Sequence, residues 1–140
     1  MSRGLSSIDT SQPEHAGFAR QCLIAGAITL AEYQDWITHL IAQDVDLPDY
    51  YFDLLDLTDR TDAIAMRDRS GNPIDARRPT ANLSRREGHA ISGIARLRFP
   101  DANHGIESPA RISLKALADC PHIVAQFREA FPFLPLFNAP

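Results

Sequence analysis

Hydrophobic side chains recur at helical spacing along most of the chain. The clearest case is residues 30–43, where the apolar side chains fall within one arc of a helical projection and the polar ones lie opposite. The apolar arc comprises Leu30, Tyr33, Trp36, Ile37, Leu40 and Ile41. Thr29 and Glu32 have capping-box spacing at its start, so each side chain can accept a hydrogen bond from a free N–H of the first turn. The pattern predicts an amphipathic helix with one buried face.

Proline and glycine positions predict the neighbouring helices. A helix over about 13–25 begins at Pro13, whose missing N–H costs nothing in the first turn, and ends at Gly26. Pro48 opens a further helix, PDYYFDLLDL, and a short helix follows within residues 58–69. Turn-forming residues then predict the longest loop, over the sequence SGNPIDARRPTAN.

A second capping box, formed by Ser84 and Glu87, predicts a helix in the second half of the chain. Its apolar residues keep helical spacing as far as residue 99, although Gly88 and Gly93 each weaken it by about 1 kcal/mol relative to alanine. A strand over residues 94–99 is the alternative.

Two further helices complete the prediction. Ser108 caps one of them with Pro109 at the first helical position, and Asp119 caps the last. Residues 132–140 form a proline-broken apolar tail that packs on the core or makes a dimer contact, and we expect residues 1–11 to be flexible. These elements predict an all-α fold, a compact single-domain bundle of five to six helices that takes in the whole chain.

The composition is that of a globular protein. The chain has 140 residues and a mass of 15.5 kDa, the usual size of one domain, with 44% hydrophobic and 23% charged residues. No apolar run approaches the ~18 residues of a membrane span, and the first residues lack a signal-peptide pattern. Cys22 and Cys120 lack the spacing of a metal site or a disulfide framework. We therefore expect a cytoplasmic protein.

The charges divide the chain into an acidic and a basic part. Residues 1–62 carry eleven acidic and three basic side chains, a net charge of −8, whereas residues 63–140 carry seven acidic and eleven basic ones, a net charge of +4. Seven aspartates lie within residues 44–62, and Arg60, the only basic residue there, is expected to offset one of them. The arginines of the basic part suit phosphate or carboxylate recognition, or they reflect the base composition of the coding sequence.

The sequence contains no motif of a known catalytic or cofactor chemistry. It has no glycine-rich phosphate loop, no nucleophile elbow and no metal-ligand spacing, so no catalytic residue, cofactor or metal site is predicted. An isoelectric point near 5.6, together with the aspartate run, disfavours nucleic acid as a partner.

Two histidine arrangements keep a small helical enzyme, or an enzyme subunit, as an alternative. Asp35 and His39 lie one helical turn apart. They form either a general base, His39, with Asp35 as the carboxylate that orients it, or a solvated pair on the helix surface. His89 and His104 flank a segment that suits phosphodiester chemistry or forms an ordinary charged face. The arginines in and next to that segment are Arg85, Arg86, Arg96 and Arg98.

The helix predicted after Pro48 carries Asp49, Asp53 and Asp56 on one face. Such a stripe forms either a solvated face or a surface that steers a basic protein partner. Tyr50 is the candidate for an exposed aromatic residue there, whereas Trp36 is expected in the core.

The residues around this helix resemble a known arrangement. The sequence ITLAEYQDWI from residue 28, then Leu40 and Ile41, then LPDYYFDLLDL from residue 47, is similar to the helix pair of small bacterial immunity proteins of polymorphic-toxin and contact-dependent growth inhibition systems. The similarity covers residues 20–60 approximately. It implies a cognate protein toxin, often a basic nuclease, whose active site is blocked by a carboxylate-rich surface. The contact surface would comprise Asp46, Asp49, Tyr50, Asp53, Asp56 and Asp59.

The leading hypothesis is therefore a non-catalytic immunity or inhibitor protein that binds a basic toxin through its acidic helix. Besides the helical enzyme, a regulatory adaptor remains as an alternative, in which the acidic part of one copy binds the basic part of another, for example as a homodimer. No membrane or nucleic-acid partner is expected.

Overall fold

The computed structural model describes residues 13–43, 50–67, 70, 73, 82–101 and 109–134. Within these residues the chain forms seven α-helices and no strand beyond one isolated bridge between Arg67 and Pro73, which confirms the all-α prediction with one helix more than expected. The helices are α1 Pro13–Ala25, α2 Leu30–Ala42, α3 Tyr50–Leu55, α4 Arg60–Ala65, α5 Arg85–Arg98, α6 Ala110–Asp119 and α7 Pro121–Ala130. The alternative strand over residues 94–99 is wrong, because α5 continues to Arg98.

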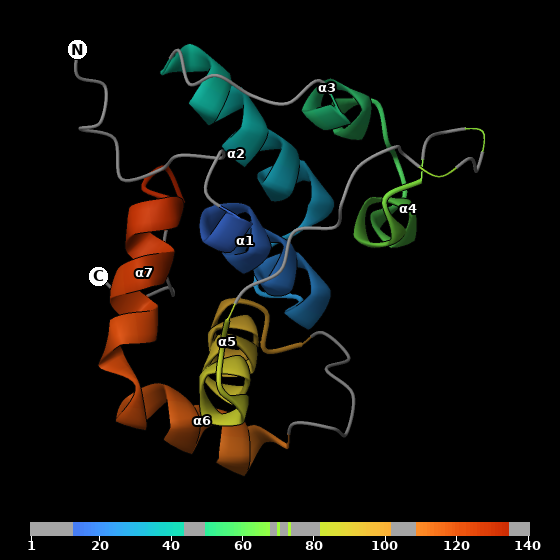
Figure 1. The fold of residues 1–140 in the computed structure, drawn as a ribbon. Coiled ribbons are helices and arrows are strands. Elements are labelled where there is room, and N and C mark those ends of the chain that lie inside the picture. Colours follow the sequence, from blue (N-terminus) through green and yellow to red (C-terminus); the bar gives the residue numbers. More distant parts are fainter. Residues whose placement is uncertain are drawn as a thin grey trace.

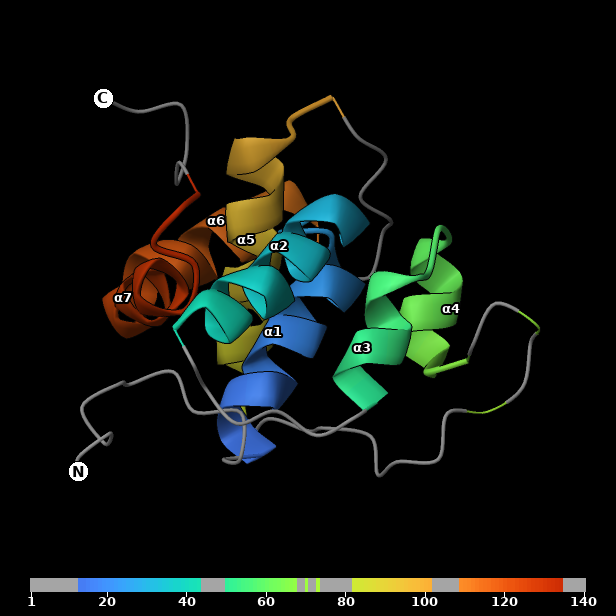
Figure 2. The ribbon, with the colours of Figure 1, turned by 90° about the horizontal axis from the view of Figure 1, so that it is seen from above.

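Helix α1 lies at the centre of the bundle, between α2 and α5 (Figure 1). Helix α4 also contacts α1, and α3 packs on α2, so the two short helices lie on one side of the molecule (Figure 2). Helix α6 packs along α5, and α7 contacts both. The central position of α1 explains why Phe18, Ala19 and Leu23 are fully buried. None of the described helices has the length and apolar character that crossing a bilayer requires.

Helix α2 has the predicted capping box and buried face. The Thr29 hydroxyl accepts a hydrogen bond from the Glu32 N–H at 3.1 Å, and the Glu32 carboxylate accepts one from the Thr29 N–H at 3.0 Å. Four members of the predicted arc are buried, namely Tyr33, Trp36, Ile37 and Leu40. Trp36 contacts the rings of Tyr33, Tyr51 and Phe131, which confirms its assignment to the core. Ile41 lies at the edge of the arc and is exposed.

The predicted ends of the last two helices are wrong in detail. Helix α6 runs through Asp119, whose carboxylate accepts a hydrogen bond from Lys115 instead of capping the next helix. Cys120 is not helical and separates α6 from α7. Pro121 begins α7, where its lack of a backbone N–H costs nothing. Pro109 is the N-cap of α6 and not its first residue. Ser108 lies outside the described residues.

Glycine is required at two positions, for different structural reasons. Gly26 ends α1 with a positive φ of 82°, where a side chain would be strained. Gly93 lies where α5 crosses α6 closely: a Cβ atom there would lie 2.6 Å from the Ser113 carbonyl oxygen. The second glycine of α5, Gly88, has open space around the same position. From the sequence alone, both glycines were expected only to destabilise α5. The structure shows that Gly93 permits the close contact between α5 and α6.

The start of the apolar tail packs on the bundle. Phe131 is buried against Phe18 and Phe127, and Leu134 packs partly against the core. Residues 1–11 and 135–140, which belong to the segments predicted as a flexible start and a proline-broken tail, lie outside the described residues. Cys22 and Cys120 are free and buried, and burial raises the pKa of the Cys22 thiol.

An ion pair joins the start of α2 to the end of α5. The Arg98 guanidinium donates to both carboxylate oxygens of Glu32, at 2.7 and 2.8 Å, and to the Ala27 carbonyl oxygen at 2.8 Å. Partial burial raises the pKa of the Glu32 carboxyl, but the hydrogen bonds from Arg98 and from the Thr29 N–H outweigh this effect and hold the pKa below its usual value.

This lowered pKa predicts a loss of stability in acid. A carboxyl group whose pKa is lower in the folded state contributes stability that is complete above its unfolded pKa, about 4.3, and that disappears as the pH falls through the folded pKa. We expect the free energy of unfolding of the E32Q variant to fall less steeply than that of the wild type below this pH. Urea titrations at a series of pH values measure both slopes, and equal slopes would contradict the prediction.

Candidate functional site

The predicted contact surface is described only in part. Asp46 and Asp49 lie outside the described residues, and Tyr50 begins α3 but its side chain is not described. Asp53, Asp56 and Asp59 are described, and all three are exposed. Three of the six predicted contact residues therefore have a described side chain, all of them in or directly after α3.

The inner side of α3 is firmly attached to α2. Tyr51 and Leu54 are buried in the core, and the Gln34 amide of α2 donates to the carbonyl oxygens of Leu54 at 3.1 Å and Leu57 at 2.8 Å. Leu54 lies in the last turn of α3 and Leu57 just after it, so these bonds tie the end of the helix to α2. Because a six-residue helix has little stability of its own, this attachment determines which side chains of α3 point outward.

The outer side of α3 presents an aromatic ring beside two carboxylates. Phe52 is 49% exposed, the largest value among the exposed large hydrophobic residues of the described chain, and is adjacent to Asp53. Asp56 lies in the turn that directly follows α3 and is also exposed. Among the described residues, no cation pairs with Asp53 or Asp56. The sequence analysis proposed Tyr50 as the exposed aromatic and did not single out Phe52; the Tyr50 side chain lies outside the described part of the structure, so that prediction stays untested.

Arg60 does not offset the aspartates, contrary to expectation. Its guanidinium donates to the carbonyl oxygens of Leu23, at 3.0 and 3.1 Å, and of Ile24, at 2.8 Å, at the end of α1. These carbonyls lie in the last turn of α1, at the negative end of the helix dipole, so they attract the cation. Asp59 has a structural role as well, since its carboxylate caps α4 by accepting from the Thr61 N–H at 2.8 Å. Of the three predicted surface carboxylates that the structure describes, Asp53 and Asp56 thus have no structural role.

The first histidine arrangement is not assembled. No hydrogen bond between Asp35 and His39 is found in the described part of the chain. Asp35 is exposed, whereas the His39 ring packs on Phe133, with 5.2 Å between the ring centroids. The buried His39 Nε2 has no hydrogen-bond partner among the residues described. In the described structure, the Asp35 carboxylate therefore does not orient the His39 ring.

The second arrangement is divided between the two ends of α5. Arg98 is bound to Glu32 at the C-terminal end, and Arg85, Arg86 and His89 lie near the N-terminal end, while His104 is outside the described residues. A pairing that the sequence did not reveal is that of His122 Nε2 with Glu87 Oε2, at 2.6 Å. Hydrogen bonds from the Ser84 N–H and from His122 hold the pKa of Glu87 below its usual value.

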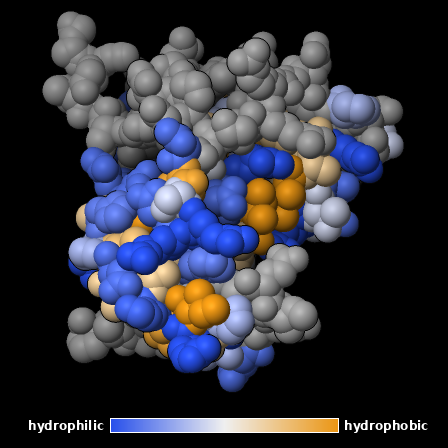
Figure 3. Space-filling model, turned by 60° about the horizontal axis from the view of Figure 1, so that its bottom comes forward, coloured by the Kyte–Doolittle hydropathy of each residue, from blue (hydrophilic) through white to orange (hydrophobic). Residues whose placement is uncertain are grey.

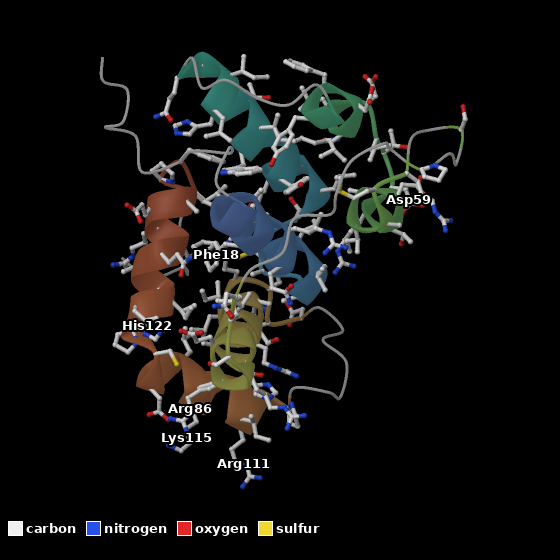
Figure 4. The ribbon with its side chains drawn as sticks, viewed as in Figure 1. Phe18, Asp59, Arg86, Arg111, Lys115 and His122 are labelled. Carbon is white, nitrogen blue, oxygen red and sulfur yellow. The ribbon has the colours of Figure 1, made fainter. Side chains whose placement is uncertain are left out.

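An open groove of about 400 Å³ lies between α5 and α6. It is lined by Arg85, Arg86, His89, Ile112, Lys115, Ala116 and Asp119. Figure 4 shows Arg86 and Lys115 near each other, with Arg111 apart from them on α6. Figure 3 brings this end of the molecule forward: hydrophilic residues cover most of its coloured surface, and hydrophobic residues form separate small patches.

The comparisons with known proteins give no relative. No protein-family model matches the chain, and neither a curated protein nor a solved structure is significantly similar to it. The resemblance to immunity proteins therefore stays a prediction from the residues. In the part of the chain that the structure describes, no three His, Cys, Asp or Glu side chains are grouped so as to hold a metal ion.

Proposed function

We propose that this protein is a non-catalytic inhibitor that binds and neutralises a basic protein, such as a nuclease-type toxin, through the outer side of α3. The observation that carries the proposal is the uncompensated charge there. Asp53 and Asp56 are exposed without a described cation beside them, and Arg60, the nearest basic residue in the sequence, is bound to the end of α1. Charge of one sign on a surface attracts an oppositely charged partner and accelerates its association.

Phe52 supplies the apolar part of such a contact. An aromatic side chain buried at the centre of an interface contributes more to slow dissociation than the charges around it, which act mainly on association. The firm attachment of α3 to α2 through Gln34 supports the same role, because a surface that is already ordered loses little conformational entropy on binding.

Affinity capture tests the proposal. The tagged protein is recovered from its own cells, washed at rising salt, and the retained proteins are identified by mass spectrometry. We expect stoichiometric recovery of one basic protein that salt removes, because salt shortens the range of charge attraction to about 8 Å at 0.15 M and about 3 Å at 1 M. Failure to recover a stoichiometric protein partner would count against an inhibitor.

The α3 aspartates are then tested with the purified partner. We expect D53N combined with D56N to slow association about tenfold at low ionic strength. The matched control is D101N combined with E129Q, which removes two exposed carboxylates elsewhere and should slow association less than about twofold. Stopped-flow mixing measures both rates. Equal slowing by the two pairs would mean that net charge, and not α3, attracts the partner.

A further inference from the structure

Helices α5 and α6 lie at the opposite end of the molecule from α3 (Figure 1), so the groove between them is independent of the proposed function. Its volume of about 400 Å³ falls within the range of small-molecule sites. Its charged walls come from two helices: Arg85 and Arg86 from the first turn of α5, and Lys115 and Asp119 from α6.

The two arginines occupy positions that disfavour them. The N-terminal turn of a helix carries the positive end of the dipole, so cations there reduce helix stability. The capping box of α5 is already complete without them, through Ser84 and Glu87. Both arginines are exposed, and neither forms a hydrogen bond or an ion pair with any residue that the structure describes. Among the described residues, therefore, no local contact accounts for these two guanidinium groups.

The charges of the groove match a doubly negative ligand. Arg85, Arg86 and Lys115 contribute three positive charges and Asp119 one negative charge, so the net charge is +2 when His89 is neutral. The Asp119 carboxylate would repel an anion, but Lys115 Nζ lies 3.1 Å from it and neutralises it. Guanidinium groups present paired N–H donors that suit the oxygens of a phosphate.

The remaining surface of the groove is apolar. Ile112 is 41% exposed and lines the groove together with Ala116, one turn further along α6. An apolar group of a ligand could bury this surface while its anionic group contacts the arginines. We propose that the groove binds a small molecule that carries a phosphate monoester next to an apolar group.

Phenyl phosphate is a suitable probe, because it combines a dianionic phosphate with an aromatic ring. In ¹⁵N–¹H spectra of the full chain at low ionic strength, we expect saturable shifts of the amide signals of α5 and α6 around the groove. The variant R86Q combined with K115Q should raise the dissociation constant at least about tenfold. The matched control, R111Q combined with R128Q, removes two exposed arginines that do not line the groove, and should change it less than about twofold.

Three results would overturn the proposal. The first is the absence of saturation at about 10 mM phenyl phosphate, a concentration far above the dissociation constant expected of a specific site. The second is an equal loss in the two double variants, which would show general attraction by net charge. The third is equal affinity for inorganic phosphate, which would show that the apolar surface takes no part. Circular dichroism of each variant confirms that these surface changes leave the fold intact.

Discussion

Replacing Arg98 by alanine is expected to lower the free energy of unfolding by about 3 kcal/mol, because removal of one member of a largely buried ion pair leaves the other charge without a partner. The Arg98 side chain is 7% exposed and that of Glu32 is 19% exposed. The loss extends beyond the pair, since Arg98 also donates to the Ala27 carbonyl oxygen and its guanidinium lies 4.8 Å from the centroid of the Phe99 ring.

The matched control is R86A, in the same helix. Arg86 is exposed and has no described partner, so its replacement should change the free energy of unfolding by less than about 0.5 kcal/mol. Urea denaturation measures both variants. The double variant R98A/E32A isolates the interaction between the two side chains, because its free energy of unfolding should fall by less than the sum of the losses in R98A and E32A. A loss below about 1 kcal/mol for R98A would show that solvent replaces the contacts of Arg98.

Alanine at Gly93 is expected to destabilise the fold by about 2 kcal/mol, although alanine favours a helix over glycine by about 1 kcal/mol. The added Cβ would lie 2.6 Å from the Ser113 carbonyl oxygen and 3.0 Å from Leu117 Cβ, so the backbone of α6 would have to move. A flexible side chain could rotate away from such a contact, but a carbonyl group within a helix cannot.

Gly88 provides the comparison within the same helix. Its Cβ position is open, so G88A should raise the free energy of unfolding by about 0.5–1 kcal/mol through the helix preference of alanine alone. Thermal or urea unfolding of the two variants therefore tests the α5–α6 contact by the sign of the change. Stabilisation by both substitutions would show that α6 is not held against α5 at this point.

Local chemistry was predicted well from the sequence. Both capping boxes, Thr29 with Glu32 and Ser84 with Glu87, are formed as expected. Gly26 ends α1, also as expected. These features depend on residues within about one helical turn of each other, and their spacing along the chain is therefore sufficient to predict them. The assignment of Trp36 to the core succeeded for a similar reason, because helical spacing reveals which side of a helix is apolar.

Predictions that depended on a choice between local partners were less successful. Aspartate is a common N-cap residue, but the Asp119 carboxylate accepts a hydrogen bond from Lys115, one turn earlier in α6. Arg60 lies among the aspartates in the sequence, yet its guanidinium binds carbonyl oxygens at the end of α1, 36 and 37 residues earlier. In each case several partners were chemically suitable, and the folded arrangement decided which of them was near.

The sequence by itself determined the all-α class, most helix bounds and the concentration of carboxylates around α3, because periodicity, caps and charge are properties of neighbouring residues. Only the tertiary structure decided that Arg98 binds Glu32, 66 residues away, that the Phe52 ring of α3 is exposed, and that Arg85 and Arg86 share a groove with Lys115. These juxtapositions arise from how the helices pack, since packing buries whole helix faces and brings distant side chains together as a consequence.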